Sequence, residues 1–328
     1  MAHITLLAYP NCSISNLTCP IDSFGIANLW HKTHTTPEEF TGPLFTWDIV
    51  TPDGRPVDGF GGLPIYPNKA IHEIEETDVI LIPGILPPIH FIGNLQEDIK
   101  NMIMKWHERE KLIGTICTGS FLLAETGLLD GHEATTNWAY ANYFQKLYPK
   151  VNLKPERILT LDNNFVCSGA TTAFMDLCLY FIEKFGSSDL SAKCAKLLLI
   201  DSTRKSQAPY FIFEFQKDHS DDKILNAQTY MEKNISGTIS FDQLAKESGI
   251  SPRHFKRRFK NATGDSPQIY LQRLRVEEAK KQLETSFESF EKITWNVGYE
   301  NSNSFRRLFK KTTGLNPLEY RKKFNSNG

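Results

Sequence analysis

Cys117 is the side chain whose type and position best suit covalent chemistry. It stands in the stretch TICTGSFLLAETGLLDG, residues 115–131, where an apolar run ends and a short helical run begins. A thiol on such a strand-to-helix turn is expected to be exposed above the sheet, and the helix N-terminus that follows favours its thiolate. Pro83-Gly84 ends a neighbouring apolar run and could present backbone N–H groups to an anion or carbonyl oxygen. Cys117 is therefore either a nucleophile or ligand contact, or an inert core cysteine.

The elements that would position Cys117 alternate between short β-rich runs and helical stretches. The expected strands are HITLLAY, FTWDIV, DVILIPG, KLIGTIC, RILTL and FVCSG. Between them lie the helical candidates LQEDIKNMIMKWHERE, NWAYANYFQKLY and TTAFMDLCLYFIEKFG. This alternation predicts an α/β domain of flavodoxin-like type, with a mostly parallel sheet and helices on both faces. Ligands of such folds bind at the carboxyl ends of strands, which is where Cys117 is expected to lie.

The other end of the chain is basic. With 328 residues, of which 40% are hydrophobic and 23% charged, the chain is long enough for two ordinary domains. The net charge of -1 hides an asymmetry, because residues 221–328 hold about 20 Lys and Arg against about 13 Asp and Glu. Charge alone is compatible with solvated helix faces or with binding to a polyanion, so the residue pattern has to decide.

That pattern is an internal repeat. Residues 244–270 match residues 293–320, and the matched positions lie 49 or 50 apart, with the change of offset in a turn. The pairs are Gly249/Gly298, Phe255/Phe305, Phe259/Phe309, Gly264/Gly314, Pro267/Pro317 and Tyr270/Tyr320. Each copy is predicted to be a helix-turn-helix, because capping serines, a proline at a first helical position and a terminal glycine punctuate it.

Each copy predicts one helix with a buried aromatic stripe and an exposed polar face. Phenylalanines four apart define the stripe, and long donors point the opposite way. The outward set is Arg253, Lys256, Arg257 and Lys260 in the first copy and Asn303, Arg306, Arg307 and Lys310 in the second. Guanidiniums suit phosphates and guanine edges, and an asparagine amide suits adenine. A predicted helix of about 18 residues, roughly 27 Å long, joins the copies and could hold them in successive major grooves about 34 Å apart.

The last hundred residues resemble the AraC/XylS family of bacterial transcription regulators, most specifically in GYENSNSFRRLFKKTTGLNPLEYRKKF. The resemblance implies an all-α domain with two helix-turn-helix motifs that binds double-stranded DNA, and contact with RNA polymerase if the protein is an activator. The family's base-contacting positions fall on Arg253, Lys256, Arg257, Ser302, Asn303, Arg306 and Arg307. Thr294 stands where the family usually has alanine, in the first helix of the second motif.

The segments DVILIPG, ICTGSFLLAETGLLDG and FVCSGATTAFMDLCL resemble the class I glutamine amidotransferase-like superfamily in its PfpI-type branch. The order of domains resembles the GlxA-type regulators. PfpI-type hydrolases have histidine directly after the cysteine, whereas this chain has Thr118. Related isonitrile-hydrating enzymes keep Cys-Thr but add an aspartate, and the matching position here is Asn16. Asn137 stands where many GlxA-type regulators have histidine.

No complete catalytic set can be written, because a nucleophilic cysteine needs a base and a carboxylate that orients it. His132, on the turn DGHEAT, is expected to be solvated, and Asp22 could face the pocket or cap a helix. We therefore predict a sensor without catalytic residues, whose ligand pocket is formed by Cys117, Thr118, Gly84, Asn16 and Asn137. An enzyme and a pure interaction module with a closed pocket are the alternatives.

The expected domains are a sensor over residues 1–215 and a DNA-binding domain over 216–328, with the aromatic residues at 210–215 docked on one of them. The partners expected are duplex DNA, a small-molecule effector and a second copy bound through the sensor. The six cysteines are scattered without zinc-ligand spacing, so we expect reduced thiols, no metal and no cofactor. No signal peptide or membrane segment is recognised, which predicts a cytoplasmic protein.

Overall fold

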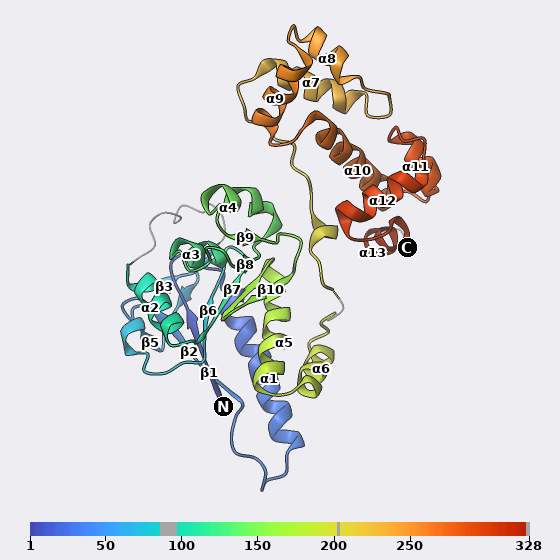
Figure 1. Cartoon of the computed structure of the whole chain (residues 1–328). Helices are drawn as coiled ribbons and strands as arrows, with labels where there is room; N and C mark the ends of the chain where they lie inside the picture. Colours follow the sequence, from blue (N-terminus) through green and yellow to red (C-terminus); the bar gives the residue numbers. More distant parts are fainter. Residues whose placement is uncertain (86–96, 202–203, 326–328) are drawn as a thin grey trace. The chain divides into compact units, whose positions relative to one another are not determined.

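The chain forms two units, Met1–Gln207 and Ala208–Gly328. The computed structural model in Figure 1 describes residues 1–85, 97–201 and 204–325. The first unit ends eight residues before the expected boundary at 215/216. Residues 208–215 belong to the second unit because Phe213 and Phe215 pack against its core, as suits a segment too apolar for a free linker.

A mostly parallel sheet forms the centre of the first unit. Its strand order is β10-β11-β7-β6-β1-β2-β5, and only the β10–β11 pair within it is antiparallel. The central strands are fully buried runs such as VILI in β6, as expected for strands covered on both faces. The strands are β1 (Ala2–Leu7), β2 (Phe45–Thr51), β5 (Lys69–Ala70), β6 (Val79–Ile82), β7 (Leu112–Ile116), β10 (Leu159–Asp162) and β11 (Phe165–Ser168).

Helices cover this sheet on both sides. In Figure 1, α1, α5 and α6 are grouped along one side of the sheet, where they contact one another, while α2 and α3 contact β7 from the other. The helices are α1 (Ser15–His34), α2 (Glu97–Glu108), α3 (Gly119–Glu125), α4 (Ala141–Leu147), α5 (Phe174–Phe185) and α6 (Ser188–Leu197). Short pairs complete the unit: β3 (Val57–Asp58) with β4 (Pro64–Ile65), and β8 (Glu133–Ala134) with β9 (Asn152–Leu153).

The described part of the second unit is helical. It contains α7 (Asp222–Lys233), α8 (Phe241–Glu247), α9 (Pro252–Thr263), α10 (Pro267–Thr285), α11 (Phe290–Asn296), α12 (Ser302–Thr313) and α13 (Pro317–Phe324). Ser240, Ser251 and Ser266 accept hydrogen bonds from backbone N–H groups at the starts of α8, α9 and α10. These caps satisfy donors that a helix N-terminus otherwise leaves unpaired.

The repeat in the sequence is a repeat in the structure. Gly264 and Gly314 end α9 and α12 in the left-handed conformation, with φ of 81° and 77°. Phe255, Phe259, Phe305 and Phe309 are all fully buried. Helix α10 serves both copies, because its first half packs into the core around Phe255 and Phe259 and its second half into the core around Phe305 and Phe309.

Thr294 fits its position without disturbing α11. The side chain is buried, and its hydroxyl donates to the Phe290 carbonyl at 2.7 Å. The extra polar atom relative to alanine is thereby satisfied. Across the described residues, no helix is both long and apolar enough to span a membrane, and no cluster of three metal-type side chains is present.

Candidate functional site

Cys117 occupies a tight elbow between β7 and α3. Its φ of 56° lies in the left-handed region that non-glycine residues rarely adopt, which stores strain at this position. The Cys117 N–H donates to the Ser168 carbonyl at 2.9 Å, so the elbow is fixed to the end of β11. Gly119 permits the close approach of α3 to β6, since a Cβ there would lie 2.5 Å from the Ile82 carbonyl oxygen.

The thiol of Cys117 is buried rather than exposed above the sheet. Only 4% of the residue is accessible, and burial raises the pKa of the thiol. Hydrogen bonding with Thr171, Asn137 and Thr118 offsets part of that rise. The expectation of an exposed thiolate is therefore wrong, because the loss of solvent outweighs the helix N-terminus, and the thiol is neutral near pH 7.

Thr118 and Gly84 hold the elbow against the chain that follows β6. The Thr118 hydroxyl donates to the Ile85 carbonyl at 2.6 Å and accepts from the Ile85 N–H at 2.8 Å. A Cβ on Gly84 would lie 3.1 Å from the Ile116 carbonyl oxygen, so a side chain is not accommodated easily. The Gly84 N–H donates to Asn16 at 3.1 Å and is not an open donor for an oxyanion, contrary to the expectation for Pro83-Gly84.

Asn16 is a buried amide with one free donor group. The residue is fully buried near the start of α1, and its Oδ1 accepts the Gly84 N–H. Its Nδ2 has no partner within the described part of the chain. A buried, unpaired amide nitrogen is costly, and a bound acceptor would remove that cost. The sequence pattern did not indicate Tyr9. This residue is also buried, and it donates its hydroxyl hydrogen to the carbonyl of Pro83, next to Gly84.

Asn137 and Thr136 close the elbow from the segment after β8. Asn137 Oδ1 accepts the Ala139 N–H at 3.0 Å, and its side chain also hydrogen-bonds with Cys117. The Thr136 hydroxyl donates to the Cys117 carbonyl at 3.1 Å. Of the four residues predicted beside Cys117, Thr118 and Asn137 hydrogen-bond with it, while the backbone N–H of Gly84 donates to Asn16. Thr171, which contacts the sulfur at 3.8 Å, was missed although it follows a predicted strand.

No ionisable side chain among the described residues hydrogen-bonds with the Cys117 sulfur. His132 is half-buried rather than fully solvated, and its Nδ1 lies 3.2 Å from a carboxylate oxygen of Asp162. Asp22 is exposed within α1 and neither caps that helix nor reaches the elbow. Among these residues the elbow therefore lacks the base that thiol activation requires.

Helices α9 and α12 present matching polar surfaces. The four predicted contacts on α9 are exposed, and those on α12 are exposed except for half-buried Ser302. Arg306 is engaged already, since its guanidinium lies 3.2 Å from Glu291 and above the Phe290 ring. The remaining cations form no ion pair within the described chain: Arg253, Lys256, Arg257, Lys260, Arg307 and Lys310.

Arg258 has a different role from its neighbour Arg257. It forms two hydrogen bonds of 2.8 Å with Asp221, the residue that caps α7. Although burial alone would raise the pKa of Asp221, hydrogen bonds from Arg258 and the Ile224 N–H hold it below its usual range. Arg258 therefore joins α9 to α7, and Arg257 remains available to a partner.

Family models match both units of the chain. A model described as the DJ-1/PfpI family covers residues 35–184, and a model described as a helix-turn-helix domain covers residues 244–323. Among curated proteins, the chain is similar to the HTH-type transcriptional regulator CdhR of Pseudomonas aeruginosa, with 22% identity over 96% of this chain and 90% of that protein. It is also 24% identical to GbdR of the same organism, over 85% of this chain and 75% of that protein. The chain therefore joins a DJ-1/PfpI domain to a helix-turn-helix domain, the architecture of the HTH-type transcriptional regulators to which it is similar.

The regulator GlxA of Rhizobium meliloti is 27% identical over 62% of this chain and 64% of that protein. An isonitrile hydratase of Pseudomonas putida is 30% identical over 43% of this chain and 60% of that enzyme. A solved structure titled a putative transcriptional regulator from Vibrio parahaemolyticus aligns with a TM-score of 0.53 and 22% identity. It covers 60% of this chain and 98% of that chain, which supports the α/β fold of the first unit.

Proposed function

We propose that this regulator recognises duplex DNA sequences through α9 and α12. The observation that carries the proposal is the pair of equivalent helices, each with buried phenylalanines behind an exposed row of donors. Helix α10, with 19 residues, is about 28 Å long and joins the two helix-turn-helix motifs to which these helices belong. That length suits two helices that enter successive major grooves about 34 Å apart.

The proposed contacts divide by chemistry. Arg253, Lys256 and Arg257 on α9, with Ser302, Asn303, Arg306 and Arg307 on α12, would reach base edges, where planar guanidiniums and amides give directional bonds. Lys260 and Lys310 would hold phosphates. Arg306 would first have to leave Glu291, so its contribution should be smaller than that of Arg307.

Selection of duplexes from random DNA by the purified full chain tests this proposal. We expect a two-part motif protected over two adjacent major grooves on one side of the duplex. Combined replacement of Arg257 and Arg307 by alanine should remove the sequence preference, while weak salt-sensitive binding remains. Recovery of no motif by the unchanged chain would overturn the proposal.

We further propose that the first unit binds a small-molecule effector at the Cys117 elbow and performs no reaction there. Asn16 Nδ2, which has no partner among the described residues, supports ligand contact, and the buried neutral thiol, which has no ionisable hydrogen-bond partner among those residues, argues against nucleophilic attack. Such a protein would work in the cytoplasm, would pair with a second copy through the first unit, and would contact RNA polymerase if it activates transcription.

Two measurements separate this proposal from its alternatives. Turnover of an amide, a glyoxal or an isonitrile that disappears in Cys117→Ser would establish an enzyme. A rise in melting temperature with one member of a metabolite panel would support a sensor, whereas no rise across the panel would favour a closed interaction module.

A further inference from the structure

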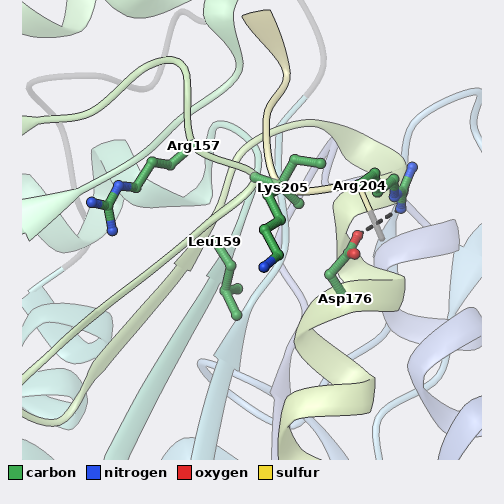
Figure 2. A pocket seen from close by; sticks show the side chains of 6 residues that line it. Arg157, Leu159, Asp176, Arg204 and Lys205 are labelled. Carbon is green, nitrogen blue, oxygen red and sulfur yellow. Dashed lines mark hydrogen bonds and ion pairs between the residues drawn. The ribbon is translucent and has the colours of Figure 1, made fainter. Parts of the chain in front are cut away.

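The first unit ends in a segment that is fastened to the sheet edge. Residues 204–207, the docking strap, run antiparallel to the chain before β10, where Ser206 pairs with Arg157. The Gln207 N–H donates to the Glu156 carbonyl at 2.8 Å. At the other end of the strap, a guanidinium nitrogen of Arg204 lies 2.6 Å from a carboxylate oxygen of Asp176. Figure 2 marks this ion pair with a dashed line.

A cavity of about 440 Å³ lies beside the strap, lined by Arg157, Ile158, Leu159, Asp176, Arg204 and Lys205 (Figure 2). The strap is therefore not packed solidly along its length. The strap is held by the Arg204 ion pair at one end, by Ser206, which pairs with Arg157 and donates to the Glu156 carbonyl, and by Gln207 at the other end. Local opening of such a segment costs less than opening of a fully packed strand.

The side chain of Gln207 is the deepest part of the strap. Only 3% of the residue is exposed, and its Nε2 donates to the Thr136 carbonyl at 2.9 Å and the Arg157 carbonyl at 3.1 Å. Gly169 leaves the room that the amide fills, since a Cβ there would lie 2.3 Å from Gln207 Nε2. Gln207 Oε1 is buried and has no partner among the described residues.

Thr136 connects this amide to the elbow. Its hydroxyl donates to the Cys117 carbonyl, while its own carbonyl accepts from Gln207. A change in the strained Cys117 backbone therefore moves the residue to which Gln207 is bonded. The unpaired Oε1 makes the docked state less favourable than a fully satisfied one, so a modest displacement at Thr136 can shift the balance toward release.

The residues that follow Gln207 are fixed to the DNA-binding unit. We call residues 208–215 the brace. The buried Lys280 of α10 donates to the Phe211 carbonyl, and Phe215 packs edge-on against Tyr270 in the core of the first motif. Tyr210 packs edge-on against Phe324 of α13 in the second motif. The brace thus touches both helix-turn-helix motifs, and no free linker separates it from Gln207.

We propose that Gln207 is the positioning residue that couples the Cys117 elbow to the DNA-binding unit. Docked, its amide holds the start of the brace to Thr136; released, it frees the brace to reposition the two motifs. This inference rests on the proposed function, and it adds the route by which occupancy of the elbow reaches α9 and α12.

Thermodynamic reciprocity allows a test that needs no effector. If opening of the elbow changes the affinity for DNA, binding of DNA must change the opening equilibrium of the elbow by the same factor. The probe is a duplex selected from random DNA by the full chain, and the readout is the rate at which iodoacetamide alkylates Cys117, followed by mass spectrometry. Because Cys117 is buried, its rate reports opening of the elbow, and half-buried Cys19 serves as an internal reference.

For the unchanged chain, we expect saturation with the selected duplex to change the Cys117 rate by about fivefold or more. In Gln207→Met, which keeps the size but loses the donors, the change should fall below about twofold. Gly169→Ala should do the same by expelling the amide without altering Gln207 itself. The matched control is Gln145→Met, because Gln145 is exposed on α4, and this variant should keep the full response.

Two other outcomes would overturn the inference, and they are distinguishable. If the unchanged chain binds no selected duplex, the proposed function fails and the coupling fails with it. The coupling alone is refuted if the duplex binds normally but changes the Cys117 alkylation rate by the same factor, including no change, in the unchanged chain, Gln207→Met and Gly169→Ala. The melting temperature of each variant shows whether it is folded during the assay.

Discussion

Substitution of two adjacent arginines of α9 should have different effects, because Arg257 should contribute to DNA affinity and Arg258 to stability. Arg257 is exposed and forms no ion pair within the described chain, so its removal takes nothing from the fold. Arg257→Ala should weaken binding to a selected duplex by about 1–3 kcal/mol, roughly 5- to 150-fold, and relax selectivity at one base position. Its melting temperature should stay within about 1 °C of that of the unchanged chain, because surface changes cost little.

Arg258→Ala should instead lower stability. The substitution removes two hydrogen bonds of 2.8 Å to Asp221, whose side chain is 19% exposed against 32% for Arg258. Bonds to a charged group are worth about 1.5–3 kcal/mol when buried, and partial exposure reduces the loss here to about 1–2 kcal/mol. For a domain near 100 residues, each kcal/mol lowers the melting temperature by about 4–8 °C.

Fluorescence anisotropy with the selected duplex and calorimetry of the full chain measure the two effects side by side. Below the melting temperature of Arg258→Ala, its DNA affinity should remain within about threefold of the unchanged chain, because its guanidinium faces α7. Equal losses of affinity for the two variants, without a difference in melting temperature, would refute the assignment of the outward face of α9.

Lys310→Ala should weaken binding to all duplexes alike and reduce the slope of log affinity against log salt by about one, as measured by titration between 50 and 200 mM salt; a change in sequence preference would contradict a phosphate role. Cys117→Ser should still respond to an effector identified by thermal shift, with affinity altered about tenfold or less because one neutral hydrogen bond is worth roughly 0.5–1.5 kcal/mol. Cys117→Trp should abolish that response and leave effector-free DNA affinity nearly intact. Effector titrations of both variants, followed by gel shift with the selected duplex, measure the response. A serine variant as unresponsive as the tryptophan one would indicate covalent or redox sensing. The pKa of Asp221 is lowered in the folded chain, so its contribution to stability is present above the unfolded value near 3.9 and is lost as pH falls through the lower folded value. The difference in melting temperature between the unchanged chain and Arg258→Ala should therefore shrink below about pH 4, and a constant difference down to pH 2.5 would contradict the ion pair.

The helical unit was the more predictable half of the fold. Its helices are punctuated by local signals, such as Ser251-Pro252 before α9 and Gly264 after it, and the structure confirms them. By contrast, α1 was not predicted as a 20-residue helix. It contacts α5, α6 and β2 and contains Pro20, so its buried residues do not form the single apolar stripe that sequence periodicity detects.

The elbow was predictable in position but not in environment. The run ending at Ile116 placed Cys117 at the end of a strand, and the structure confirms that place. Its burial depends on Thr136, Asn137 and Thr171, which come from segments distant in sequence. Solvent exposure is a property of the assembled fold, so a local pattern could not reveal that the thiol is covered.

The peptide bond between Gln207 and Ala208 has a practical consequence for recombining regulators. A chimaera joined after Phe215 would graft the foreign sensor's own sequence in place of the brace and expose Tyr270 and Lys280, which the native brace covers. A junction at 207/208 leaves Gln207 with its sensor and the brace with its helices. Exchanged modules should therefore remain soluble and inducible only when the seam lies ahead of Ala208.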